Sequence, residues 1–147
     1  FGDPERLKQV LLNLLSNAIK FTDNGSIVLA VRLLKENETQ HLVEFSVEDT
    51  GVGISLEQQE QLFKNYSQLQ TTAVRKLGGT GLGLAICKKI CHILGGQLHV
   101  SSSPGKGSRF WFTVPFKKVN GLIVPSKEEI KLNNRARSAK LRVAERI

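Results

Sequence analysis

The sequence predicts a two-layer α/β sandwich, in which a mixed sheet is covered on one face by about three helices. Two long stretches repeat apolar residues with the period of an amphipathic helix, and a shorter stretch follows a helix cap. Two pairs of segments have the alternation and turn signals of hairpins, and a further strand is expected to complete the sheet. With 147 residues, 40% of them hydrophobic, the chain can enclose one ordinary core.

The first helix is predicted over residues 3–22, with Asp3 as its cap and Pro4 at its first helical position. At about 100° per residue, its apolar residues fall on one stripe. The polar residues form a second stripe, which consists of Arg6, Gln9, Asn13, Asn17 and Lys20.

The first hairpin is predicted from residues 26–34 and 41–48, after an Asp-Asn-Gly turn signal. In its second strand the apolar residues alternate onto one face, and the period of two carries that face on to Asp49. A carboxylate is therefore aimed at the apolar side, where the strand meets a turn that contains Gly51 and Gly53.

The rest of the domain is predicted to contain a short helix, a glycine-rich loop that opens a second long helix, and a second hairpin. In order, these are a helix at 55–66 capped by Ser55, an aperiodic polar stretch at 67–76, a loop and helix from 78 to the Gly95-Gly96 stop, and strands at 98–102 and 108–115. Cys87 and Cys91 lie four apart on the apolar stripe of the long helix, which predicts core packing and not a metal site or disulfide. We expect reduced, cytoplasmic surroundings.

Residues 1–116 are predicted to form the domain, and residues 117–147 a basic tail. The tail contains nine Lys and Arg against three Glu, so it holds +6 of the net charge of +8. It is interpreted either as a linker or as the start of a further domain, with helix possible at 127–132 and 136–143. Because the charge lies in this tail and the tail contains no aromatic residues on which bases could stack, we expect no nucleic-acid partner.

Two asparagines one turn apart, Asn13 and Asn17, are unusual on a helix face, because solvated faces are mostly built from Glu, Lys and Arg. Amide oxygens can ligate a hard cation, and Lys20 can reach a phosphate as a point charge. A magnesium-bound nucleotide would satisfy all three side chains. Amides that merely face solvent are an equal alternative.

Asp49 is the second candidate, because an aspartate that faces an apolar interior is costly unless it accepts good hydrogen bonds. The amino group of adenine is a donor that such a carboxylate can select, and Gly51 and Gly53 would let the backbone come close beside it. The alternative is an Asx-type turn at the end of a strand.

The loop GGTGLGL, from Gly78 to Leu84, is the third candidate, since free backbone amides at a helix N-terminus form a phosphate site. The Walker pattern is excluded because no GK[ST] follows. The dinucleotide fingerprint is excluded because no convincing strand precedes the loop.

These pieces together resemble a known family. The chain contains, in order and at the family's intervals, NLLSNAIKFT, VEDTGVGI, QLFKNYSQL, GGTGLGLAI and GSRFWFTVP. They resemble the successive motifs of the catalytic domain of histidine kinases, which belongs to an ATPase superfamily with DNA gyrase, MutL and the heat-shock chaperones. The resemblance covers roughly residues 2–116 and leaves out the tail.

The resemblance implies a role for each matching position. Asn17 would coordinate Mg²⁺ with support from Asn13, Lys20 would contact phosphate, and Asp49 would accept the adenine amino group. The other implied nucleotide contacts are Gly51, Gly53 and Ile54 beside the base, Phe63, Tyr66, Gln68 and Arg75 in a lid, Gly79, Thr80, Gly81, Leu82, Gly83 and Leu84 in the phosphate loop, and Thr113 in the last strand. Tyr66 stands where many relatives have Phe.

The implied activity is transfer of the γ-phosphoryl group of ATP, with Mg²⁺, to a histidine on a dimerisation domain and then to an aspartate on a receiver domain. His41, His92 and His99 lack the motif of the acceptor histidine and are assigned to the scaffold. We therefore expect ATP or ADP binding, a monomeric fragment of a homodimeric parent, and no self-phosphorylation. The parent could be membrane-anchored, although no apolar run here approaches the roughly 20 residues of a bilayer span.

Three alternatives stay open at this point. The chain could be a nucleotide-binding regulatory or interaction module without kinase activity. It could be an ATP-driven clamp of the same superfamily, although it lacks the long additional segments of those proteins. Its tail could also make it a nucleic-acid binder.

Overall fold

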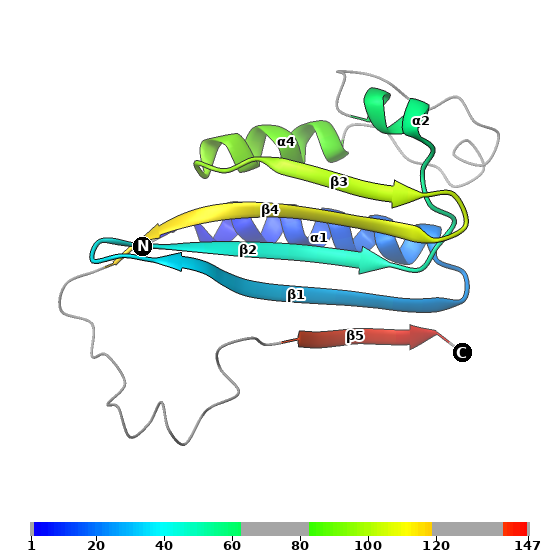
Figure 1. Ribbon diagram of the computed structural model, residues 1–147, viewed down its shortest axis with the longest axis horizontal. Helices are drawn as coiled ribbons and strands as arrows, with labels where there is room; N and C mark the ends of the chain where they lie inside the picture. The colour runs from blue at the N-terminus through cyan, green and yellow to red at the C-terminus, as the bar shows by residue number, and fades with distance from the viewer. Residues whose placement is uncertain (1, 63–82, 119–139, 147) are drawn as a thin grey trace.

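The computed structural model describes residues 2–62, 83–118 and 140–146. Its helices and strands, in chain order, are α1 (Pro4–Phe21), β1 (Gly25–Glu36), β2 (Gln40–Asp49), α2 (Leu56–Gln61), α4 (Gly83–Ile93), β3 (Leu98–Ser103), β4 (Gly107–Lys117) and β5 (Lys140–Arg146). Figure 1 shows a sheet with α1 behind one face, α4 alongside the edge strand β3, and α2 beside the end of β3. The predicted two-layer sandwich is confirmed.

The sheet is antiparallel, and the prediction of a mixed sheet is wrong. Its strand order is β3-β4-β2-β1-β5, and each of the four neighbouring pairs is antiparallel. The reason is the connectivity, since β1–β2 and β3–β4 are hairpins and β4 runs back along β2. A parallel pair would have required a crossover between neighbours.

The tail contributes β5, which pairs with β1 from Gly25 opposite Arg146 to Ala30 opposite Lys140. The prediction of helix over residues 136–143 is therefore wrong from Lys140 onward. A strand that hydrogen-bonds to an open sheet edge can override a weak local helix preference. The other predicted tail helix, at 127–132, lies outside the described residues.

Helix α1 begins and packs as its sequence predicts. The Asp3 side chain accepts a hydrogen bond from the backbone amide of Arg6 at 3.1 Å, and Pro4 is the first helical residue. Val10, Leu14 and Ala18 are buried against α4 and the sheet. Asn13 of the neighbouring polar stripe is thereby held beside Gly83, at the start of α4.

Helix α4 contributes both cysteines to the core, as predicted. Cys87 and Cys91 are fully buried and free, and burial raises the pKa of their thiols to about 11 and about 12. The helix ends where Gly95 takes a positive φ of 82° and the amide of Gly96 donates to the Cys91 carbonyl at 2.9 Å. The cysteines are therefore packing residues and not reactive groups.

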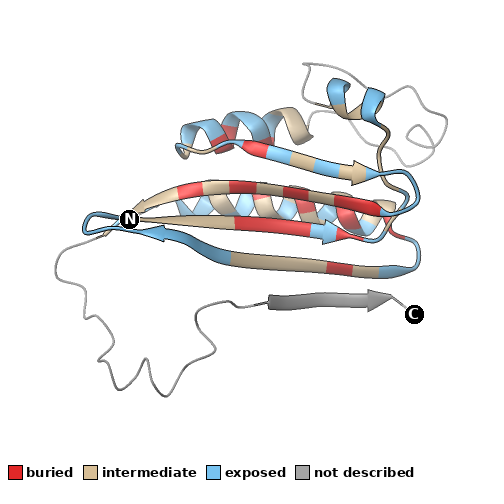
Figure 2. Ribbon diagram, in the orientation of Figure 1, coloured by how far each residue is buried: buried red, intermediate tan, exposed pale blue. Residues whose placement is uncertain are grey.

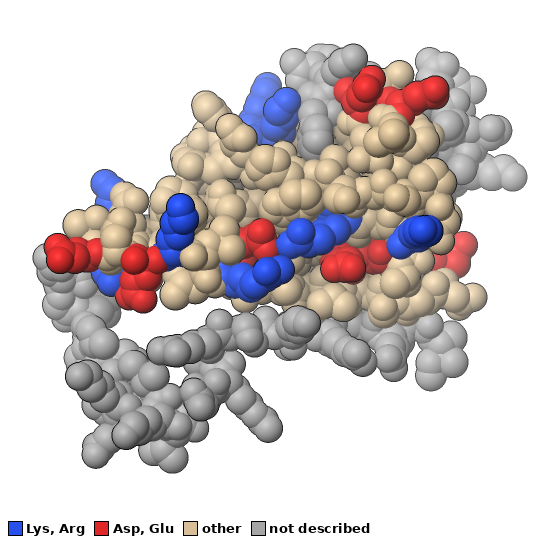
Figure 3. Space-filling view, in the orientation of Figure 1, with Lys and Arg blue, Asp and Glu red and all other residues tan. Residues whose placement is uncertain are grey.

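The core lies between the helices and one face of the sheet. Figure 2 shows buried residues alternating along β4, and those of β2 and β4 that face the helices include Phe45, Val47, Phe110 and Phe112. The other side of the sheet, here called the open face, carries basic and acidic side chains interspersed (Figure 3). There Glu44 accepts from Arg109 at 2.9 Å.

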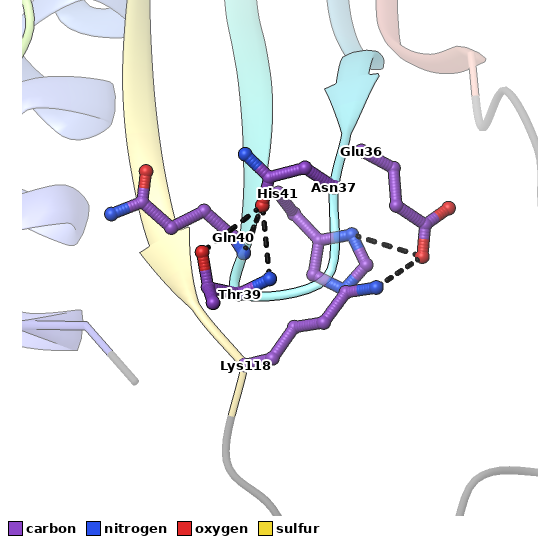
Figure 4. Close-up of polar contacts among 6 residues, drawn as sticks. All are labelled: Glu36, Asn37, Thr39, Gln40, His41 and Lys118. Carbon is purple, nitrogen blue, oxygen red and sulfur yellow. Dashed lines mark hydrogen bonds and ion pairs between the residues drawn. The ribbon is translucent and has the colours of Figure 1, made fainter.

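The end of the sheet away from Asp49 holds a network of polar contacts (Figure 4). The Asn37 side chain accepts from the amides of Thr39 and Gln40 at 3.0 and 2.7 Å, which closes the β1–β2 turn. The Lys118 ammonium group lies 2.8 Å from the Glu36 carboxylate, and the Lys118 amide donates to the Thr39 carbonyl at 2.8 Å. The chain is thus tied to the sheet as far as Lys118.

Candidate functional site

Asp49 ends β2 on the face of the sheet that carries the helices, as the alternation predicts. It is 7% exposed and stands opposite Ser108 of β4. Desolvation by burial raises the pKa of its carboxyl, against the lowering effect of hydrogen bonds from the backbone of Gly51 and Ser108. A buried acid of this kind is suited to accept a hydrogen bond from a ligand.

Asp49 also forms an Asx-type turn at the end of its strand, which was the alternative interpretation of this residue. Its Oδ1 accepts from the Gly51 amide at 2.9 Å, which is the geometry of an Asx-type turn. The two interpretations are compatible, because a carboxylate has several acceptor positions. The turn fixes the direction in which the carboxylate points.

The segment Asp49–Gly53, here called the base-side turn, packs against the end of α1. The amide of Val52 donates to the carbonyl of Phe21 at 3.2 Å. A side chain on Gly51 would overlap that carbonyl, and Gly53 has a positive φ of 70° against the backbone of Ser103. Both glycines are therefore required by the close packing of the turn.

The polar stripe of α1 meets the first residue of α4. A Cβ on Gly83 would lie 2.6 Å from Oδ1 and 2.7 Å from Nδ2 of Asn13, so the Asn13 amide rests directly on the Gly83 backbone. Asn13, Asn17 and Lys20 are all partly exposed. The Lys20 ammonium group lies 5.5 Å from the centre of the Phe21 ring.

One helix thus touches two predicted halves of a site. The last residue of α1 contacts the base-side turn, and Asn13, two turns earlier, contacts Gly83 at the end of the glycine-rich loop. Ile54 and Leu84, which were also predicted to contact nucleotide, are partly buried and pack against the core.

Thr113 does not belong to this site, and its prediction as a contact to the base is wrong. It pairs with Glu44 and points to the open face, between the inward-facing Phe112 and Val114. Asp49 lies on the opposite face, at the Ser108 end of β4. The alternation of the strand places Thr113 on the same face as Arg109 and Trp111, and this pattern excludes it from the face of Asp49.

Eight further predicted contacts lie outside the described residues. These are Phe63, Tyr66, Gln68, Arg75, Gly79, Thr80, Gly81 and Leu82. Their assignments stay predictions.

A hydroxyl network next to Asp49 was missed in the sequence. The Ser102 hydroxyl accepts from the Ile54 amide at 2.8 Å, donates to the Gly107 carbonyl at 2.8 Å and lies 2.9 Å from the Ser108 hydroxyl. The Gln59 side chain donates to the carbonyls of Ile54 and Ser102. Alternation back from Phe110 would have placed Ser108 on the same face of the sheet as Asp49.

A groove of about 250 Å³ runs past the β3–β4 hairpin and reaches Asp49. Its other lining residues include Glu48, Ser101 and Arg109, which belong to the open face, and none of the polar stripe of α1 lines it. We therefore do not assign this groove to the nucleotide, because the phosphate half of the predicted site lies on the helical side.

Within the described residues, no three His, Cys, Asp or Glu side chains gather as a metal site. Amide oxygens, such as those of Asn13 and Asn17, remain as candidate ligands for a hard cation. No helix in the described part of the chain is both long and apolar enough to cross a membrane.

Comparison with known proteins agrees with this geometry. Residues 2–118 match the family of histidine kinase-, DNA gyrase B-, and HSP90-like ATPases. Hybrid signal transduction histidine kinase B of Dictyostelium discoideum is 49% identical over 114 residues, which are 78% of this chain and 6% of that protein. The chain therefore spans a small part of the curated relative.

Solved structures give the same result. The structure of full-length ShkA in complex with AMPPNP superposes with a TM-score of 0.62 at 35% identity, covering 78% of this chain and 22% of that one. The catalytic domain of the histidine kinase ThkA superposes with a TM-score of 0.56 at 33% identity, covering 78% of this chain and 68% of that one. The chain belongs to the histidine kinase-, DNA gyrase B-, and HSP90-like ATPase family, as an ATP-binding catalytic domain of the histidine-kinase type.

Proposed function

We propose that this domain binds MgATP and presents its γ-phosphoryl group to a histidine on a separate dimerisation domain of the parent protein. The phosphoryl group then passes to an aspartate of a receiver domain. The observation that carries this proposal is the contact of α1 with both the base-side turn and Gly83. A purine and its phosphates could therefore lie along one helix.

The base would be recognised by Asp49. Its buried carboxylate would accept from the 6-amino group of adenine, and the close packing of Gly51 and Gly53 would hold the base-side turn in place beside the ring. Guanine carries a carbonyl at that position, and two hydrogen-bond acceptors, the carbonyl and the carboxylate, would repel each other. The proposal therefore includes selectivity for ATP over GTP.

The phosphates would be held at the other half of the site. Asn17 would coordinate Mg²⁺ and Asn13 would support it, since their amide oxygens are suitable ligands on the stripe next to Gly83. Lys20 would contact phosphate as a point charge. Bound Mg²⁺ would supply neutralisation of phosphate charge, and the domain would contribute mainly positioning.

The lid and loop contacts are proposed from sequence similarity to the family. Around the phosphates they comprise Gly79, Thr80, Gly81, Leu82, Gly83 and Leu84, and in the lid Phe63, Tyr66, Gln68 and Arg75. Ile54 would lie under the base, where its backbone amide is fixed by Ser102.

The three histidines are proposed to have scaffold roles. His99 stacks on Trp111 with ring centres 5.4 Å apart, His41 lies 3.7 Å from the Glu36 carboxylate, and His92 is exposed in the last turn of α4. His99 lies on the open face and His41 lies at the end of the sheet away from Asp49. The acceptor histidine is therefore expected on another domain or another chain.

The proposal is tested by calorimetry with ATP, ADP and GTP, with and without Mg²⁺, followed by incubation with labelled ATP. We expect binding of ATP and ADP, strengthening by Mg²⁺ for ATP, weak binding of GTP and no label on the chain itself. Label should appear on an added dimerisation domain from a close relative. Acid-labile label on this chain alone would contradict the proposal, and binding without transfer to any acceptor would favour a regulatory nucleotide-binding module.

A further inference from the structure

Thr22 is a buried polar residue at the junction between α1 and the base-side turn. It follows the last residue of α1 with an extended backbone, φ −121° and ψ 98°, and is 2% exposed. Among the described residues, its hydroxyl is the buried side-chain group that has no hydrogen-bond partner. Such a group is unfavourable, because it has lost its contacts with water without replacing them.

The two ends of the Thr22 side chain face different segments. A Cβ on Gly51 would lie 2.8 Å from the Thr22 hydroxyl oxygen, and a Cβ on Gly25 would lie 3.5 Å from its methyl group. The hydroxyl therefore faces the base-side turn, and the methyl packs toward the start of β1. The neighbouring link from the Val52 amide to the Phe21 carbonyl is 3.2 Å long.

An unpaired buried hydroxyl next to a ligand-binding turn suggests that its partner arrives with the ligand. We propose that Thr22 is a positioning residue for base recognition, whose hydroxyl forms a hydrogen bond to the backbone of the base-side turn when that turn closes on a bound nucleotide. This inference rests on the proposed function of Asp49. Thr22 itself is not expected to touch the nucleotide.

The proposal has a thermodynamic consequence that ordinary packing does not share. Without nucleotide, the hydroxyl destabilises the fold, and with nucleotide it contributes a hydrogen bond to the complex. Replacement of Thr22 by valine keeps the shape of the side chain. It removes both the destabilisation of the empty domain and the hydrogen bond in the complex. Replacement by serine keeps the hydroxyl but loses the methyl that packs toward Gly25.

The test measures thermal unfolding without nucleotide and ATP affinity by calorimetry for Thr22→Val and Thr22→Ser. We expect Thr22→Val to raise the midpoint of thermal unfolding without nucleotide by about 2–4 °C and to weaken ATP binding roughly fivefold. Thr22→Ser should lower the midpoint while keeping the affinity within about twofold of the unmodified chain. Ser46→Ala, which removes another buried hydroxyl from β2, is the control and should leave the affinity unchanged.

The outcomes separate this inference from the proposed function. If the unmodified chain binds no ATP, the proposed function fails. If it binds ATP and Thr22→Val binds equally well, only the role of Thr22 is refuted. If both Thr22 variants lose stability and affinity together, Thr22 is a packing residue and the inference is also refuted.

Discussion

The contact between Asn13 and Gly83 allows a test of whether this pair belongs to the phosphate half of the site. In Gly83→Ala, the new methyl group would lie 2.6 Å from Oδ1 of Asn13 and 2.7 Å from Nδ2, which is closer than real Cβ contacts allow. The atoms in the way belong to the end of a rotatable side chain. The substitution therefore turns the Asn13 amide away and leaves the backbone in place.

The expected effect on stability is small. Forcing a side chain from its rotamer costs about 0.5–1.5 kcal/mol. Because Gly83 is the first residue of α4, replacement by alanine recovers only part of the roughly 0.5–1 kcal/mol gained in the middle of a helix. The unfolding free energy should thus change by less than about 1 kcal/mol. If Asn13 supports bound Mg²⁺, loss of its contact should cost about 1 kcal/mol of MgATP affinity, or roughly fivefold.

A double-mutant cycle distinguishes displacement of Asn13 from a direct effect of the methyl group on the ligand. MgATP affinity is measured by calorimetry for Gly83→Ala, Asn13→Ala and the double variant, with urea denaturation as the measure of folding. In the Asn13→Ala background the methyl group has no amide to displace, so the second substitution should weaken binding no further. Additive losses in the double variant would refute the reasoning from the Asn13 contact.

The remaining predictions concern the base, the metal and the hydroxyl network. Asp49→Asn should weaken ATP binding roughly tenfold and reduce the preference for ATP over GTP, because a charge-assisted hydrogen bond becomes a neutral one; unchanged selectivity in calorimetry would contradict this. Since burial raises the pKa of Asp49 above 3.8, the unfolding free energy of the apo chain should fall as pH rises from 3.8 through the raised pKa, and Asp49→Asn should flatten this dependence in urea titrations at pH 4 and 7. Asn17→Ala should remove most of the strengthening of ATP binding by Mg²⁺ while leaving metal-free ADP binding within about twofold, as titrations with and without EDTA would show. Ser102→Ala should lower the unfolding free energy by about 1–3 kcal/mol, because the Ile54 amide and Gly107 carbonyl lose their partner; a change below about 0.5 kcal/mol in urea denaturation would argue against this network.

The sequence predicted most of the fold because local signals and long-range packing agree. The Asp3 cap, the Gly95–Gly96 stop and the inward alternation of β2 all appear in the structure near their predicted positions. Most boundaries moved by one or two residues, since strand ends depend on pairing partners, whereas α2 ends at Gln61 and not at the predicted Tyr66. The sequence did not predict that all strands pair antiparallel or that the tail forms strand β5, because both features depend on contacts between segments distant in sequence.

The candidate site was predictable where one residue type has a chemical reason to occupy a position. Asp49 was identified because a carboxylate on an apolar face requires an explanation, and the structure confirms that this residue is buried there. Its contact with a nucleotide stays a prediction. Ser102, Ser108 and Thr22 were missed, because serine and threonine are common at strand and helix ends and carry no such signal. Their importance depends on which atoms lie beside them, and only the fold supplies that information.

The two ends of the sheet differ in how well their polar groups are satisfied. At the far end, Asn37 and Glu36 are engaged by several donors, including the Lys118 ammonium group. At the base end, the Asp49 carboxyl has a raised pKa and the Thr22 hydroxyl has no partner. Unfavourable features that persist in a fold tend to lie where a ligand relieves them. The unsatisfied polar groups at the base end would make the empty domain less stable than its packing alone suggests. A nucleotide that satisfies them would stabilise the complex by a corresponding amount.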